Sequence, residues 1–215
     1  KTGVSVGRAA QRECAAYLLD HGGWAGVPHT AMLWVLHTAA ADGAGAGLQV
    51  ELKSGSFQRF VPHSCTAEEL GARQFAKVTT QRVACFDIRV CNSDRCFFFL
   101  FFFLKYFFAD DPLALTVVPI DHGFILPHYR MLGELNFEWA SWPQASEPLS
   151  ETDVAYVSAL DSHADAAMLR IASSLPEECL LSLHLGTALL QLGVAAGLTL
   201  AQIALLAVRG ELFFK

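Results

Sequence analysis

The sequence lacks several features that would assign it to a common class of protein. No Cys-x-x-Cys pair is present and no histidine pair stands at zinc-finger spacing, so a structural zinc site is not expected. We interpret the six cysteines as reduced, mostly buried thiols of a cytosolic protein. Residues 1–20 lack the apolar core of a signal peptide. Because the chain begins with Lys1 rather than Met, we expect a fragment or an incomplete gene model.

Charge is also scarce. Only 17% of the 215 residues are charged, whereas 53% are hydrophobic, which is more apolar than an average soluble domain. A sizeable core is therefore expected, in one large domain or two small lobes, and disorder over most of the chain is not. The net charge of -6 argues against a general nucleic-acid binder, so no nucleic-acid partner is expected.

No charged residue occurs between Cys179 and Val208. A run of this length passes a crude test for a transmembrane helix. However, it contains polar side chains, and Gly197 is followed by Thr199, a good first residue for a second helix. We interpret the run as two buried helices joined near Gly197, and keep a membrane span as the alternative.

The remaining patterns predict a mixture of helices and strands. Residues 8–20 are predicted to form a helix, since Ala10, Cys14, Tyr17 and Leu18 fall on one face. Further helices are predicted over residues 28–41, over about 151–160 with Ser150 as the cap, and over 165–173. Strands are predicted over residues 48–52, 56–61, 82–91 and 115–120, with a turn at Ser54-Gly55 between the first two.

Residues 96–108 contain an unusual density of phenylalanine. The tract is too short to cross a bilayer as a helix, and Lys105 interrupts it. As a strand it would expose aromatic rings and promote aggregation. We interpret it as a translated intron or a frameshift, with a membrane-dipping loop as the alternative.

Two aspartates follow predicted strands and carry the chemistry of interest. Asp94 stands in the polar turn after residues 82–91, and Asp121 stands in Ile120-Asp121-His122-Gly123. Phosphoryl transfer from ATP needs one carboxylate beside the attacking hydroxyl and another that holds Mg²⁺. Each aspartate alone also fits an ordinary solvated turn, but their order and separation suggest a kinase-like site. Gly123 is expected to let the backbone turn sharply there.

These residues carry a resemblance to a known family. The chain is similar to the phosphatidylinositol 3- and 4-kinases, and within them to the plant type-II-like (gamma) phosphatidylinositol 4-kinases. The similarity covers nearly the whole chain except residues 97–113. The segments that carry it are Arg12-Glu13-Cys14-Ala15-Ala16-Tyr17-Leu18-Leu19-Asp20, Ser56-Phe57-Gln58-Arg59-Phe60-Val61-Pro62-His63, Asp87-Ile88-Arg89, Asn92-Ser93-Asp94-Arg95, Pro119-Ile120-Asp121-His122-Gly123 and Phe137-Glu138-Trp139-Ala140-Ser141-Trp142-Pro143-Gln144-Ala145.

The resemblance implies roles for particular residues. Asp94, with Arg95 beside it, would be the catalytic aspartate that orients the inositol hydroxyl, and Asp121 would bind Mg²⁺. Glu13 would pair with the lysine that binds ATP, with an exposed helix charge as the alternative. The hinge that touches adenine would include Phe60, Val61 and Pro62, which otherwise fit an ordinary strand. We expect Trp139 and Trp142 to lie in the core rather than to face a membrane.

Two departures from the family pattern bear on activity. The family continues Asp-Arg-His-Ala-Gly-Asn, and its asparagine helps to hold the metal, but Phe99 occupies that position here. A phenyl ring cannot bind Mg²⁺, which requires oxygen ligands. In addition, residues 1–11 contain no recognisable Gly-rich phosphate loop or strand lysine. We therefore expect this chain, as written, to be inactive or nearly so.

The resemblance implies an α+β, protein-kinase-like fold. Residues 1–62 would be the remnant of the amino-terminal lobe and the hinge, and residues 63–215 the mostly helical carboxy-terminal lobe. The implied function is ATP- and Mg²⁺-dependent phosphorylation of phosphatidylinositol at the 4-hydroxyl, by a cytoplasmic protein that associates peripherally with membranes. A protein Ser/Thr kinase of the same family, a pseudokinase that acts as an interaction module, and an integral membrane protein remain alternatives.

Overall fold

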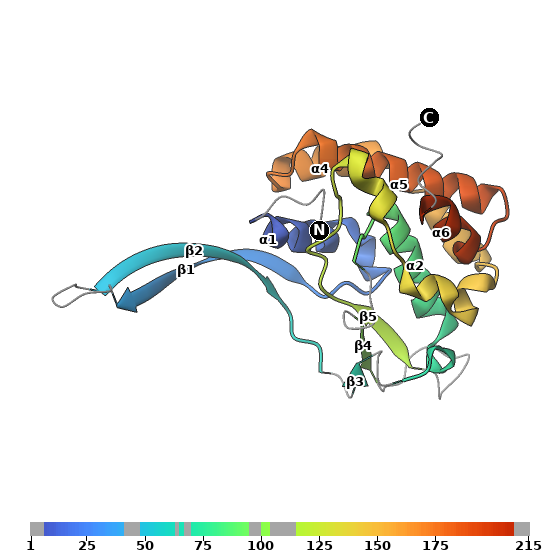
Figure 1. The fold of residues 1–215 in the computed structure, drawn as a ribbon, viewed down its shortest axis with the longest axis horizontal. Helices are drawn as coiled ribbons and strands as arrows, with labels where there is room; N and C mark the ends of the chain where they lie inside the picture. Colours follow the sequence, from blue (N-terminus) through green and yellow to red (C-terminus); the bar gives the residue numbers. More distant parts are fainter. Residues whose placement is uncertain are drawn as a thin grey trace.

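The computed structural model describes residues 7–40, 48–62, 65–66, 70–94, 100–103 and 115–208, which form a helical body with a long projecting hairpin (Figure 1). The α-helices are α1 (Ala9–Leu19), α2 (Lys77–Arg89), α3 (Glu151–Ser158), α4 (Ser162–Ala172), α5 (Glu177–Ala195) and α6 (Leu200–Val208). The strands are β1 (Thr30–Ala40), β2 (Leu48–Gln58), β3 (Cys65–Thr66), β4 (Leu100–Phe103) and β5 (Thr116–Pro119). Short 3₁₀ helices connect them at η1 (His21–Gly23), η3 (Ala72–Gln74), η5 (Tyr129–Glu134), η6 (Glu138–Ser141) and η7 (Pro143–Ser146). The chain is thus a mixed α+β fold, as predicted.

Helix α2 is the central element of the body, and it occupies the region that we predicted as a strand over residues 82–91. All residues from Val83 to Arg89 are buried. A helix that is buried on every side shows no polar face, so its sequence has no helical period. The β-branched residues Val83 and Ile88 then imitate a strand, and the strand prediction is wrong.

Strands β1 and β2 pair antiparallel along their whole length, from Thr30 opposite Gln58 to Ala40 opposite Leu48. The helix predicted over residues 28–41 is therefore wrong. The turn predicted at Ser54-Gly55 is also wrong, because both residues lie inside β2. Both errors have one cause. The two strands are stabilised by pairing with each other, and the propensity of each segment on its own does not reveal that pairing.

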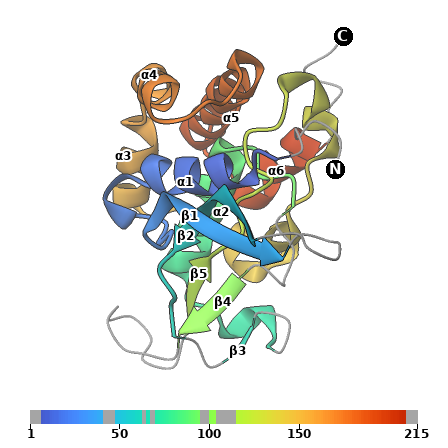
Figure 2. The ribbon, with the colours of Figure 1, turned by 90° about the vertical axis from the view of Figure 1, so that its left-hand side faces the viewer.

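The hairpin leaves the body (Figure 1), and several of its apolar side chains are exposed. Trp34 and Leu36 of β1 lie on the same face as Leu52 and Val50 of β2, and each of the four is more than 60% exposed. Viewed along the hairpin, α1 lies between it and helices α4 and α5 (Figure 2).

Strand β4 pairs antiparallel with β3 on one side and with β5 on the other. The predicted strand over residues 115–120 is confirmed by β5. Strand β4 consists of residues 100–103 of the phenylalanine-rich tract, and the rest of that tract lies outside the described residues. Whether the tract is a translated intron or a frameshift stays a prediction.

The two caps that we predicted, Ser150 for α3 and Thr199 for α6, are confirmed. The Ser150 side chain accepts a hydrogen bond from the backbone N–H of Asp153 at the start of α3. The Thr199 hydroxyl accepts one from the N–H of Gln202 in the first turn of α6, with an N···O distance of 3.3 Å. The uncharged run is thus two helices, with Gly197 in the left-handed conformation between them. By length and composition alone α5 could also cross a membrane, but half of its most apolar window is buried in the protein.

The core contains the aromatic side chains that we expected there. Trp139 and Trp142 are almost fully buried, and Trp142 packs against Phe75 with ring centroids 4.9 Å apart. Cys85 and Cys91 are free buried thiols, and burial raises the pKa of Cys91 to about 12. A second group of buried residues joins α1 to α2, α4 and α5. The proposed division at residue 62 stays a prediction.

Candidate active site

The first loop of the site begins where α2 ends. Cys91 has a φ of 50°, which turns the chain sharply after Val90. The backbone N–H of Asn92 then donates to the carbonyl of Asp87 at 2.9 Å. The Asn92 side-chain oxygen accepts from the N–H of Asp94 at 3.1 Å. Asp94 therefore follows a buried helix and an Asx turn, and not a strand as we predicted.

The second loop follows β5 and runs from Asp121 to Leu126. Asp121 and Leu126 have φ values of 54° and 48°. We expected Gly123 to provide the sharp turn, but Asp121 itself is the left-handed residue. A left-handed aspartate costs less than a left-handed bulky residue, because its short polar side chain can bond locally. A Cβ at Gly123 would lie 3.4 Å from the Cβ of Ala9, which is an ordinary van der Waals contact, so neither the turn nor the packing requires glycine here.

The two loops are hydrogen-bonded to each other, so Asp94 and Asp121 stand on adjoining loops. The N–H of Leu126 donates to the carbonyl of Val90 at 2.8 Å. The Ser93 hydroxyl donates to the carbonyl of Phe124 at 3.1 Å. In the described part of the chain, the non-glycine residues with left-handed φ all lie in these loops: Cys91, Asp121 and Leu126. Such strain is frequent at functional sites.

Helix α1 brings a third carboxylate to the site. A Cβ at Gly123 would lie 3.7 Å from Glu13 Oε1 and 3.6 Å from Asp121 Oδ1, so both carboxylates border this glycine. Glu13 Oε2 also lies 3.6 Å from Nδ1 of the fully buried His122. Glu13 is therefore close to the Asp121 loop. Whether it pairs with an ATP-binding lysine stays a prediction.

Arg12 fixes α1 against the same loop. Its Nε donates to the carbonyl of Ile125 at 2.8 Å, and Nη2 donates to that of Leu126 at 3.4 Å. Arg12 is fully buried, and this burial lowers its pKa. The buried face of α1 is Arg12, Ala15, Ala16 and Leu19, so the face that we predicted is rotated. The predicted face contained only apolar and aromatic side chains, so it did not include the buried Arg12.

The other predicted site residues have different surroundings. Phe60 and Pro62 follow β2 and are exposed, Phe60 by 74%, whereas Val61 is partly buried. Their contact with adenine stays a prediction. Arg95 and Phe99 lie outside the described residues.

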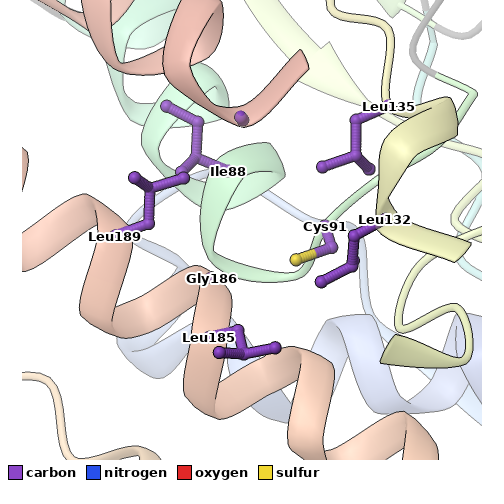
Figure 3. A pocket seen from close by; sticks show the side chains of 8 residues that line it. Ile88, Cys91, Leu132, Leu135, Leu185, Gly186 and Leu189 are labelled. Atoms are coloured by element: carbon purple, nitrogen blue, oxygen red, sulfur yellow. The ribbon is translucent and has the colours of Figure 1, made fainter. Parts of the chain in front are cut away.

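Figure 3 shows the residues that pack beneath the first loop. Cys91 lies at the end of α2 and faces Leu132 and Leu135, and α5 passes beside it.

The side chains at the site have the chemistry that Mg²⁺ requires. Asp94, Asp121 and Glu13 supply carboxylate oxygens, and Mg²⁺ prefers oxygen ligands. Within the described ranges no three His, Cys, Asp or Glu side chains are grouped as a metal cage. A kinase-type Mg²⁺ is held by one or two carboxylates together with the substrate phosphates, so the donor set fits the ion.

Sequence reasoning missed two residues of this site. Asn92 was quoted only as part of a motif, although an asparagine two residues before Asp94 is the signal of an Asx turn. Arg12 gave no signal of its own, because a buried arginine cannot be distinguished from an exposed one in a short helix.

A buried helix and a strand thus present two aspartates on paired loops, which is the arrangement of a kinase-type catalytic domain. The model of the family "Phosphatidylinositol 3- and 4-kinase" matches residues 1–203, so the chain belongs to the phosphatidylinositol 3- and 4-kinase family.

Several curated plant proteins are similar to it. Phosphatidylinositol 4-kinase gamma 8 of Arabidopsis thaliana is 38% identical over 94% of this chain and 38% of its own length. Phosphatidylinositol 4-kinase gamma 1 of the same plant is 39% identical over 94% of this chain and 36% of its own length. Phosphatidylinositol 4-kinase gamma 4 of Oryza sativa subsp. japonica is 35% identical over 93% of this chain and 34% of its own length. The chain thus spans little more than a third of these relatives.

Proposed function

We propose that this chain is the catalytic part of a 1-phosphatidylinositol 4-kinase, which transfers the γ-phosphate of ATP to the 4-hydroxyl of phosphatidylinositol. The observation that carries the proposal is the pairing of the Asp94 loop with the Asp121 loop through Leu126 and Val90. The names of the plant relatives support a lipid acceptor. In this proposal α1 and the hairpin are what the chain contains of the amino-terminal lobe, and the helical body is the carboxy-terminal lobe.

The side chains have distinct tasks in this reaction. Asp94 accepts the proton of the inositol hydroxyl and orients its oxygen toward the phosphate. Asp121 would hold Mg²⁺, and the carboxylate of Glu13 lies beside the same loop. When bound, Mg²⁺ neutralises the charge that develops on the phosphates. The expected residues of the adenine site are Phe60, Val61 and Pro62. Positioning by these groups supplies most of the catalysis.

Phe99 bears on the rate of transfer. It stands at the position of the metal-binding asparagine in the family pattern and offers no oxygen ligand. Transfer by this chain is therefore slow. The same observation favours a second candidate function, a pseudokinase that acts as an interaction module. The proposed lipid substrate implies a cytoplasmic protein that meets the membrane surface peripherally.

The acceptor can be determined directly. Incubated with Mg²⁺, γ-labelled ATP and phosphatidylinositol vesicles, the chain is expected to label the lipid slowly, and to label a generic protein acceptor such as myelin basic protein at least about tenfold less. Chromatography of the deacylated product should give the 4-phosphate. Vesicles of phosphatidylcholine, which lacks the inositol ring, are the matched control.

Two other results would contradict the proposal. Label on the protein acceptor alone would establish a protein Ser/Thr kinase. If neither acceptor were labelled more than in a control reaction without the protein, the chain would be a pseudokinase and not a lipid kinase.

A further inference from the structure

A chain of hydrogen bonds leads from the buried core to Asp94. The indole Nε1 of Trp139 donates to Asp87 Oδ2 at 3.0 Å. The Asn92 side-chain amide donates to Asp87 Oδ1 at 3.0 Å. The Asn92 side-chain oxygen accepts from the N–H of Asp94 at 3.1 Å. Each link thus uses a different atom, and none competes with the next.

These groups come from separate parts of the chain. Asp87 lies in the last turn of α2, Asn92 lies in the loop that follows, and Trp139 lies in η6, 52 positions away from Asp87. Asp87, Asn92 and Trp139 are between 0% and 1% exposed, so water does not compete for their hydrogen bonds. Buried networks of this kind fix a single geometry, because a lost partner leaves an unsatisfied polar group.

The backbone adds a second connection between the same residues. The N–H of Asn92 donates to the carbonyl of Asp87 at 2.9 Å, so both the main chain and the side chain of Asn92 are attached to Asp87. Asn92 therefore has little freedom to rotate. The N–H of Asp94 is held at a fixed distance from the core, which restricts the direction of its side chain.

We propose that Asp87, Asn92 and Trp139 are positioning residues that set the orientation of Asp94. The proposal rests on Asp94 as the catalytic aspartate of the proposed function. It gives Trp139 of the Phe-Glu-Trp segment a role in addition to packing. None of the three touches a reacting atom, and each acts only through Asp94.

An exchange of residues tests this geometry. In Asp87→Asn the new side chain has one oxygen and one N–H₂ group in place of two oxygens. If the N–H₂ points to Asn92, it faces another N–H₂ donor. If it points to Trp139, the indole N–H loses its acceptor. In Asn92→Asp two carboxylates face each other. In the double variant Asp87→Asn, Asn92→Asp these three hydrogen bonds can form again. The new amide accepts from Trp139 and donates to the new carboxylate, which accepts from the N–H of Asp94.

The readout is hydrogen exchange at the backbone N–H of Asp94, followed by NMR of the whole chain. Each single variant is expected to speed this exchange about tenfold, which corresponds to about 1.4 kcal/mol. The double variant is expected to return it to within about threefold of the wild type. This exchange measurement does not depend on catalysis, so it still tests the proposal if the chain transfers no phosphate.

Gln81→Glu is the matched control. Gln81 is a buried amide of the same helix, and it donates to the carbonyls of Gln144 and Glu147, away from Asp94. Loss of the Gln81 amide is expected to lower the global stability. Hydrogen exchange at the N–H of Asp94, relative to the other amides of the chain, is expected to stay unchanged. Where transfer is measurable, the single variants should lower kcat and leave KM for ATP within about twofold. Unchanged exchange at Asp94 in both single variants would overturn the proposal, and so would a double variant that exchanges as fast as they do.

Discussion

Replacing Gly186 with alanine is expected to lower the free energy of unfolding by about 2 kcal/mol or more. A Cβ at this position would lie 2.4 Å from the carbonyl oxygen of Arg89 and 2.6 Å from that of Ile88. Both obstacles are backbone atoms of α2, so α5 and α2 must separate. Alanine gains about 1 kcal/mol of helix propensity over glycine, but overpacking of about 3 kcal/mol exceeds that gain.

Gly193→Ala is the matched control in the same helix. Its Cβ would meet Ile203 at 2.5 Å, but the contact atoms belong to a side chain, whereas those at Gly186 are backbone carbonyl oxygens. A side chain can shift without separating the two helix backbones, so the loss at Gly193 should be smaller than the loss at Gly186. Urea unfolding followed by circular dichroism gives both values. Equal midpoints for the wild type and Gly186→Ala would show that the close packing of α5 on α2 in Figure 3 is wrong.

Removing the charge of Asp165 should cost about 3–5 kcal/mol, because it leaves the guanidinium of Arg89 buried without its counter-ion. Arg89 of α2 pairs with Asp165 of α4, and the two side chains are only 2% and 5% exposed. Arg89 Nη1 also donates to the carbonyl of Leu19 at 2.7 Å, so the pair joins three helices. Asp165→Asn keeps the shape of the side chain, and its effect on the urea midpoint reports the charge.

Glu177→Gln is the control for an exposed pair. Arg170 and Glu177 form two hydrogen bonds at 2.7 and 2.8 Å, which raise the pKa of Arg170 and lower that of Glu177, but both side chains are exposed. Solvent screening should leave the midpoint of this variant close to the wild type. The double variant Arg89→Met, Asp165→Leu should be more stable than Asp165→Asn, since it leaves no unpaired charge. A loss no larger in Asp165→Asn than in Glu177→Gln would contradict the buried pair.

The sequence predicts best those elements that depend on local chemistry. Ser150 and Thr199 are caps because their hydroxyls accept from the first turn of a helix, and this requires only neighbouring residues. Strand β5 is short, apolar and bounded by turns, so it was predicted as well. The family could also be inferred from the sequence, since its motifs combine several residue types at fixed spacing.

Elements that depend on distant contacts were not predictable in the same way. Helix α2 has no polar face, because Asp87 and Arg89 point to buried partners on η6 and α4. Strand β1 forms only because β2 pairs with it. At the site, the sequence indicated Asp94 and Asp121, but not how the loops pair or which of their residues turn left-handed. Those features depend on backbone contacts, which side-chain identity does not encode.

The central claim, that Asp94 acts on the acceptor at a site shared with Asp121, is tested most directly by phosphate transfer from Mg²⁺-ATP to phosphatidylinositol, compared between the wild type and Asp94→Asn. The asparagine keeps the size of the side chain but cannot accept the proton. The account predicts that transfer falls by about 10²–10³-fold, while the affinity for a fluorescent ATP analogue stays within about twofold. Transfer by Asp94→Asn at the wild-type rate would contradict it.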